Sequence, residues 1–161
     1  MDGRRQLLRR RAMATSTRKD PLRGFNFQVD IDGVGAASFS EVSGLTADGD
    51  AVDYREGLDP INNVRKLQGL RKFPMIVMKR GYIQDDELWQ WYARIYAGQD
   101  DRRNGSVTLL NEQRQAVMRW QFENAWINKI EGPSLKAAGN EVAIESMELC
   151  HEGLTFELEP Q

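Results

Sequence analysis

Apolar and polar residues alternate along most of the chain, a pattern typical of β-strands with one buried face. The stretch FNFQVDIDG places apolar side chains at every second position, at Phe25, Phe27, Val29 and Ile31. Asp32-Gly33 then predicts a hairpin turn. The next residues, VGAASFSEVSGL, are expected to return as a second strand that ends near Gly44, and AVDYRE forms a third.

Three later segments also read as strands. FPMIVMKRGY predicts a long one, with Pro74 at its start or on a sheet edge because proline cannot donate to a ladder. GSVTLLNEQRQAVMRWQFENAWINKIEG predicts a hairpin around Glu112–Gln115. Its second strand is long enough that it must bend or serve two sheets. The apolar residues of this strand fall at even positions: Met118, Trp120, Phe122, Trp126 and Ile130.

The last strands contain a conflict of phase. In EVAIESMELCHEG, Val142 and Ile144 are even whereas Met147 and Leu149 are odd, which predicts a bulge near Glu145–Ser146. LTFEL closes the chain with its apolar residues in one phase.

One helix is expected, in DDELWQWYARIYAG. Its apolar residues recur with helical spacing, at Leu88, Trp91, Tyr92 and Ile95. Acidic residues begin it and Gly98 follows its end. Its apolar face must cover an antiparallel sheet. The predicted fold is therefore mainly β: an antiparallel barrel or two-sheet sandwich of about seven strands, with one flanking helix.

Length and charge divide the chain into a basic N-terminal arm and one domain. The 161 residues suffice for one domain with its own core. Residues 1–12 hold five arginines and one aspartate, so the remainder carries 17 basic and 23 acidic residues, a net charge of −6. We expect a flexible arm over residues 1–19, with Met13 as an alternative start, and a single domain over 20–161. The acidic domain argues against a general nucleic-acid binder.

No reaction centre is apparent, so no enzyme activity, cofactor or metal is expected. Cys150 is the only cysteine and His151 the only histidine. Adjacent strand residues point to opposite faces, so these two cannot bind one ion together. Asp30, Asp32, Gly35 and Glu41 match calcium-loop positions, but Val34 supplies no side-chain oxygen and the flanks alternate as strands.

The stretch DYREGLDPINNVRKLQG, residues 53–69, differs from its surroundings. It is charged and interrupted by proline. It is also longer than an ordinary hairpin loop, which has about two to five residues. Few of its side chains are apolar, so it contributes little to a monomer core.

Nine stretches in order resemble the tail tube protein family of contractile phage tails and contractile injection systems. They are DPLRGFNFQVDIDG, FSEVSGL, DYREG, VRKLQG, KRGY, DELWQWY, VTLLNE, RWQFENAW and EVAIESMELCHEGL, and they span residues 20 to about 156. The family often reads LPG where this chain has Leu67-Gln68-Gly69, and it commonly has Asp and Gly in the turn after VTLL.

The resemblance implies a structural subunit that forms stacked hexameric rings, and thereby a hollow conduit for DNA or protein cargo inside a contractile sheath. The implied partners are other copies of the chain, the sheath protein, and baseplate, tube-initiator and tube-terminator proteins. Synthesis in the bacterial cytoplasm and residence in the tail tube are expected. Residues Glu56 to Lys66 would be an inter-subunit arm whose charges set the register between rings. The subunit-interface candidates are Tyr54, Arg55, Glu56, Leu58, Asp59, Ile61, Asn62, Asn63, Val64, Arg65, Lys66, Arg80 and Glu152.

Two alternatives remain open from the sequence. One is a tube-initiator or baseplate paralogue with the same fold. The other is a small-ligand-binding β-barrel. Trp120, Phe122 and Trp126 argue against it, because such large side chains would fill the interior of a small barrel.

Overall fold

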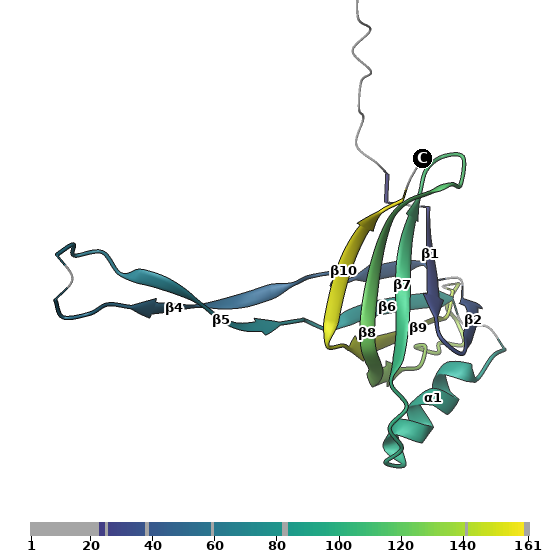
Figure 1. Cartoon of the computed structure of the whole chain (residues 1–161). Helices are drawn as coiled ribbons and strands as arrows, with labels where there is room; N and C mark the ends of the chain where they lie inside the picture. The colour runs from purple at the N-terminus through teal and green to yellow at the C-terminus, as the bar shows by residue number, and fades with distance from the viewer. Residues whose placement is uncertain are drawn as a thin grey trace, which may run out of the picture.

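The computed structural model describes residues 23–24, 26–37, 39–58, 60–81, 84–140 and 142–159. In these residues the chain forms ten strands and one helix (Figure 1). The strands are β1 (Phe27–Ile31), β2 (Val34–Ala37), β3 (Glu41–Ser43), β4 (Asp48–Tyr54), β5 (Arg65–Lys72), β6 (Ile76–Gly81), β7 (Arg103–Leu110), β8 (Ala116–Glu131), β9 (Ile144–Cys150) and β10 (Gly153–Leu158). The helix α1 (Glu87–Tyr96) lies between β6 and β7. The expected basic arm, residues 1–19, lies outside the described residues.

Strand β8 belongs to two layers of antiparallel sheet. Its first part pairs with β7 and β10, and β7 continues to β1 and β2. Its last part pairs with β9, which continues to β6 and β3. The prediction that this strand bends or serves two sheets is confirmed.

The change of layer occurs at Asn124. This residue has a φ of 52°, and its backbone N–H donates to Asn104 Oδ1 over 3.0 Å. The register between β7 and β8 shifts here, so the inward phase changes from even residues to odd ones. Ala125 and Ile127 are buried, whereas Trp126 is only partly buried. The expectation of one even phase through Ile130 is therefore wrong.

The core lies between the two layers. The first layer supplies Val29, Val107 and Phe122, and the second supplies Met78 and Met147, all at most 3% exposed. The helix covers the core with Leu88 and Trp91, as its spacing predicted. The mainly β class with one helix is confirmed. The sheets do not close into a barrel, so the two-sheet alternative describes the architecture.

Two strand predictions are wrong in detail. The segment expected as one strand from Val34 to near Gly44 is divided: β2 pairs with β1, whereas β3 pairs with β6 in the other layer. The bulge near Glu145–Ser146 is absent from the register of β9 with β6, which runs unbroken from Ile144 to Leu149. Ile144 is 49% exposed, so odd residues point inward throughout and Glu145 is one of them.

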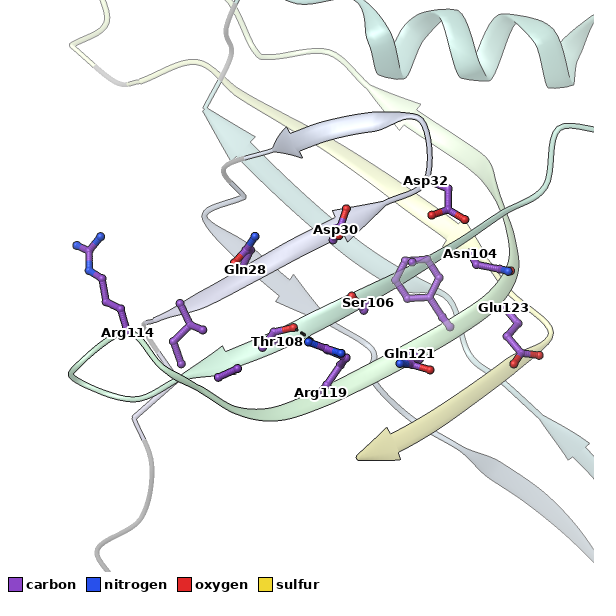
Figure 2. A pocket seen from close by; sticks show the side chains of 14 residues that line it. Gln28, Asp30, Asp32, Asn104, Ser106, Thr108, Arg114, Arg119, Gln121 and Glu123 are labelled. Atoms are coloured by element: carbon purple, nitrogen blue, oxygen red, sulfur yellow. Dashed lines mark hydrogen bonds between the residues drawn. The ribbon is translucent and has the colours of Figure 1, made fainter. Parts of the chain in front are cut away.

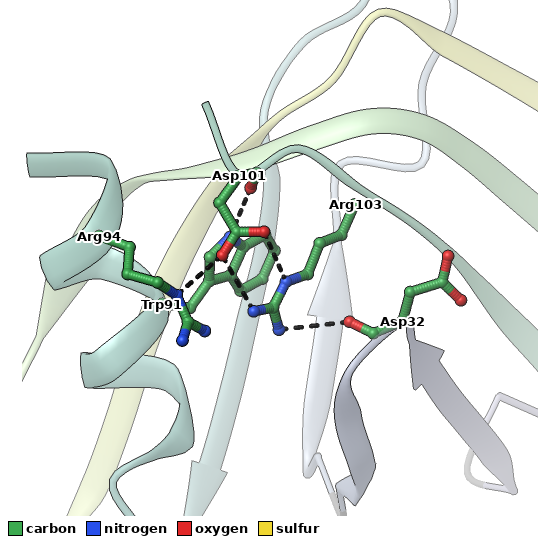
Figure 3. A network of polar contacts seen from close by, with 5 residues as sticks. All are labelled: Asp32, Trp91, Arg94, Asp101 and Arg103. Carbon is green, nitrogen blue, oxygen red and sulfur yellow. Dashed lines mark hydrogen bonds and ion pairs between the residues drawn. The ribbon is translucent and has the colours of Figure 1, made fainter. Parts of the chain in front are cut away.

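A network of polar contacts fixes α1 to the turn between β1 and β2 (Figure 3). The guanidinium of Arg103 lies 4.7 Å from the ring centre of Trp91 and donates to the Asp32 carbonyl over 3.2 Å. Asp101 accepts hydrogen bonds from Arg94 (2.9 Å) and Arg103 (3.1 Å), and its own carbonyl accepts one from Trp91 Nε1 over 2.8 Å. The helix therefore has a fixed position on the sheet.

Hydrogen bonding by Arg103 holds the pKa of Asp101 below its ordinary value. This effect exceeds the opposing effect of burial, and the charges of Arg103 and Arg94 add to it.

Candidate assembly surfaces

Strands β4 and β5 form a separate two-stranded ribbon that projects far from the two layers (Figure 1). From here on, the arm means β4, β5 and their connection, residues 48–72. It includes the segment from Glu56 to Lys66 that the sequence predicts to join subunits, and it is distinct from the basic N-terminal segment. Every residue of the arm that the structure describes is exposed except Gly69, which is half-buried. The connection between the strands, residues 55–64, is the tip of the arm. The arm contributes nothing to the core of the monomer.

The register of the arm gives it two unlike faces. Val52 pairs with Leu67, and both side chains are 50% exposed. The next pair along the ribbon, Asp53 with Lys66, points to the opposite face and forms an ion pair of 3.0 Å. Around Val52 and Leu67 the first face is therefore apolar, with Arg65 opposite Tyr54 and Lys72 opposite Asp48 farther along it, whereas the second face carries the Asp53–Lys66 ion pair.

The tip carries the remaining loop candidates. Tyr54 Oη donates to Glu56 Oε1 over 3.1 Å, and Arg55 Nη2 donates to Asn62 Oδ1 over 3.2 Å. Leu58 and Ile61 are 96% and 63% exposed. The other tip candidates that the structure describes, Asn63 and Val64, are exposed as well, and Asp59 lies outside the described residues.

The root of the arm is tightly packed. Gly44, with a φ of +85°, precedes β4, and a Cβ at this position would lie 2.2 Å from the carbonyl oxygen of Met75, which precedes β6. His151 is buried beside the root: its Nε2 lies 3.0 Å from the Pro74 carbonyl and its Nδ1 lies 3.0 Å from the Gly153 carbonyl. The only histidine thus joins the root of the arm to the start of β10.

Two interface candidates lie on the body instead of the arm. Arg80 is 1% exposed and forms a buried ion pair with Glu145, so the surface role expected for it is wrong. Glu152 lies in the turn between β9 and β10, where it pairs with Arg102 and accepts a hydrogen bond from Asn124 Nδ2 over 3.2 Å. The structure therefore brings the residues of the arm together but places these two elsewhere.

A second surface, absent from the sequence-based candidates, is the polar face of the first layer (Figure 2). Cross-strand register brings polar side chains into rows over β1, β7, β8 and β10. One row is Asp30, Ser106, Gln121 and Thr155, and its neighbour is Gln28, Thr108, Arg119 and Glu157. The apolar partners Val29, Val107 and Phe122 point to the core on the other side. Alternation alone could have found this face, by taking the polar phase of each strand as one surface.

The polar face encloses a hollow of about 510 Å³. Its charged lining residues are three carboxylates and two guanidinium groups, from Asp30, Asp32, Glu123, Arg114 and Arg119. In the described residues no group of three or more His, Cys, Asp or Glu side chains is arranged to hold a metal ion. No helix in the same residues is long and apolar enough to cross a membrane.

Residues 23–155 match the family model of the T4-like virus tail tube protein gp19. The chain belongs to this tail tube family. No curated protein sequence matches it.

Solved structures agree with this assignment. A chain of the sheath-tube complex of an extracellular contractile injection system, PVC, in its extended state is 25% identical, with a TM-score of 0.77; the match covers 86% of this chain and 93% of that one. A chain of the tube-terminating cap of the anti-feeding prophage is also 25% identical, with a TM-score of 0.80 and coverage of 91% and 100%. Hcp1 from Flavobacterium johnsoniae, at 12% identity, a TM-score of 0.54 and coverage of 83% and 95%, shares the fold. The protein is a tail tube subunit.

Proposed function

We propose that copies of this tail tube protein form hexameric rings that stack into a hollow conduit inside a contractile sheath. The observation that carries the proposal is the arm. A subunit that folds alone gains nothing from a long exposed ribbon, whereas a subunit in a closed ring meets a neighbour on every side. The arm extends beyond the sheets of its own subunit (Figure 1). In a ring, another copy is therefore the surface within its reach.

The arm residues are the proposed subunit interface: Tyr54, Arg55, Glu56, Leu58, Asp59, Ile61, Asn62, Asn63, Val64, Arg65 and Lys66. Glu152 remains a candidate because its turn is exposed. Burial of apolar side chains at the tip would contribute about 1.5–3 kcal/mol each if they became fully covered. The contribution is repeated in every copy along the tube.

The polar face is the proposed wall of the channel. A wall that passes a polymer without binding it should lack apolar patches and carry charge of the same sign as the polymer. The rows across β1, β7, β8 and β10 are polar, and carboxylates outnumber guanidinium groups in the hollow. Such a wall suits DNA or acidic protein as the cargo, passed without sequence-specific contacts.

The proposed partners are the sheath, the baseplate and the proteins that begin and end the tube. Similar chains occur in a sheath-tube complex, in a tube cap and in a baseplate. The tail tube of a phage or of a related injection particle is the proposed location, after synthesis in the bacterial cytoplasm. In this role the protein acts as a rigid conduit and performs no catalysis.

A more specific place in the tube, as a tube initiator or baseplate paralogue at its end, is the second candidate function. The cap and baseplate chains similar to this protein favour it, because the same fold serves at both ends of a tube. The two functions differ in the length of the assembly. An initiator should stop at one or a few rings, whereas a tube subunit should polymerise.

Electron microscopy of the purified protein tests the proposal. We expect rings that stack into tubes at high concentration. A variant with residues 56–66 replaced by Asn-Gly should stay soluble and melt cooperatively, because this segment lies outside the core, yet form single rings at most. Long tubes from this variant would contradict the interface role of the tip. A wild-type protein that stays monomeric at all concentrations would contradict the tube itself.

A further inference from the structure

We infer that the apolar face of the arm, defined by Val52, Tyr54 and Leu67, is the face that packs against a second copy of this chain, whereas the opposite face, with Asp53 and Lys66, stays in water. The inference rests on the proposed function and specifies how its interface is built. It also changes one assignment made above: Lys66 is moved from the proposed interface to the solvent side of the arm, and apolar burial takes the place of charge in setting the contact between subunits.

The first argument is the instability of an isolated ribbon. A two-stranded hairpin is marginal in water unless a further strand or another surface covers its apolar side. In the arm, Val52, Tyr54 and Leu67 are 50%, 45% and 50% exposed on one face of the ribbon. Both ribbon edges are also open, since β4 and β5 pair only with each other among the described strands. The arm therefore needs a covering surface for its two strands to stay paired.

The second argument is the state of the charges. The Lys66–Asp53 ion pair of 3.0 Å lies within the ribbon, on the face opposite Val52 and Leu67. Charges that are already paired inside one subunit attract a charged group of a neighbour less strongly. Burial of such a pair would also cost free energy of desolvation. The charged face is therefore suited to solvent and the apolar face to a protein surface.

The third argument identifies the occupant. The arm points away from its own body, so its own sheets cannot cover it (Figure 1). In a closed ring or a stack of rings every subunit has the same environment, so another copy of the chain lies beside every arm. A second copy is the occupant that lets all arms be covered equally.

Two matched double variants test the inference. Val52→Thr with Leu67→Thr removes the central apolar pair, and Asp53→Thr with Lys66→Thr removes the ion pair on the opposite face. Threonine favours strands, so the ribbon itself is preserved in both variants. We expect the first variant to raise the concentration needed for ring and tube formation by at least about tenfold. The second should need a concentration within about twofold of that of the wild type, because exposed ion pairs contribute little to stability.

Sedimentation and electron microscopy distinguish the outcomes, with thermal unfolding as the check that each monomer is folded. If both variants assemble like the wild type, the face assignment is overturned while the tube function stands. If only the charged-face variant fails to assemble, the contact uses the opposite face. A wild-type protein without rings or tubes would instead overturn the proposed function. A photocrosslinker at residue 52, in a mixture of ¹⁵N-labelled and unlabelled protein, should give cross-links between unlike isotopes; cross-links only within one chain would refute the second copy as occupant.

Discussion

Arg80 of β6 and Glu145 of β9 are direct cross-strand partners whose side chains meet inside the core, with Arg80 Nε 3.1 Å from Glu145 Oε2. Both residues are 1% exposed. Arg80 Nη1 also lies 3.9 Å from Asp85 Oδ2, just before α1. The pair thus connects the second layer to the start of the helix.

Removal of one partner should be much worse than removal of both. Arg80→Met leaves a buried carboxylate without its cation, and we expect it to lower the free energy of unfolding by about 3–5 kcal/mol. The double variant Arg80→Met with Glu145→Met should recover most of that loss, because an apolar pair replaces the ionic one. Urea denaturation of the two single variants, the double variant and the wild type measures the coupling. Additive losses would show that the two side chains do not act as a pair.

The network around Asp101 should make stability depend on pH. The pKa of Asp101 is lower in the folded state than its ordinary value, so its contribution is full above the ordinary carboxylate range and is lost as pH falls through the folded pKa. The melting temperature of Asp101→Asn should therefore lie below that of the wild type at pH 7. The difference should shrink below about pH 4. Asp100→Asn is the control, because the Asp100 side chain is 83% exposed. An unchanged difference at all pH values would contradict the role of the Asp101 charge.

The close approach at the root of the arm should make Gly44 intolerant of a side chain. In Gly44→Ala the new Cβ would meet the Met75 carbonyl, and the φ of +85° adds strain. We expect a loss of about 2 kcal/mol or more in the free energy of unfolding. Gly57→Ala, with no atom within 4 Å of its Cβ, should change stability little. Equal melting temperatures for the two variants would show that the root is not packed as described.

The N-terminal arginine-rich segment should be dispensable for folding. Residues 1–12 contain Leu7 and Leu8 as their only adjacent apolar pair, too little to add to a core. A chain that starts at Met13 should have the same thermal midpoint as the full chain. A clear fall in the midpoint would mean that the segment docks on the domain.

Local patterns predicted those elements that are decided by local chemistry. The helix followed from the spacing of Leu88 and Trp91, and the first hairpin followed from Asp32-Gly33, where Gly33 has a φ of +73°. Local patterns do not show which sheet a strand joins, so the alternation from Val34 to near Gly44 predicts one strand where the structure has β2 and β3. They also failed where charged residues occupy inward positions: Glu145 and Arg80 look like surface residues until a partner across the sheet is known.

The candidate interface was also predictable only as far as local patterns reach. Exposure of the arm followed from its charges and turn residues, which cannot fill a core. Its division into two faces required the register of Val52 with Leu67, which no single strand reveals. The polar face likewise needed the pairing of four strands that are distant in sequence.

The passage of β8 through both layers has a mechanical consequence. A tube that is driven forward carries compressive load, and in a sandwich of separate sheets that load would shear one layer past the other. Here one covalent backbone, from Ala116 to Glu131, runs through both layers, so stress on the first layer reaches the second without crossing a side-chain interface. The kink at Asn124 is then the point where this load path changes direction, and the hydrogen bond from the Asn124 backbone to Asn104 ties that point to the neighbouring strand β7.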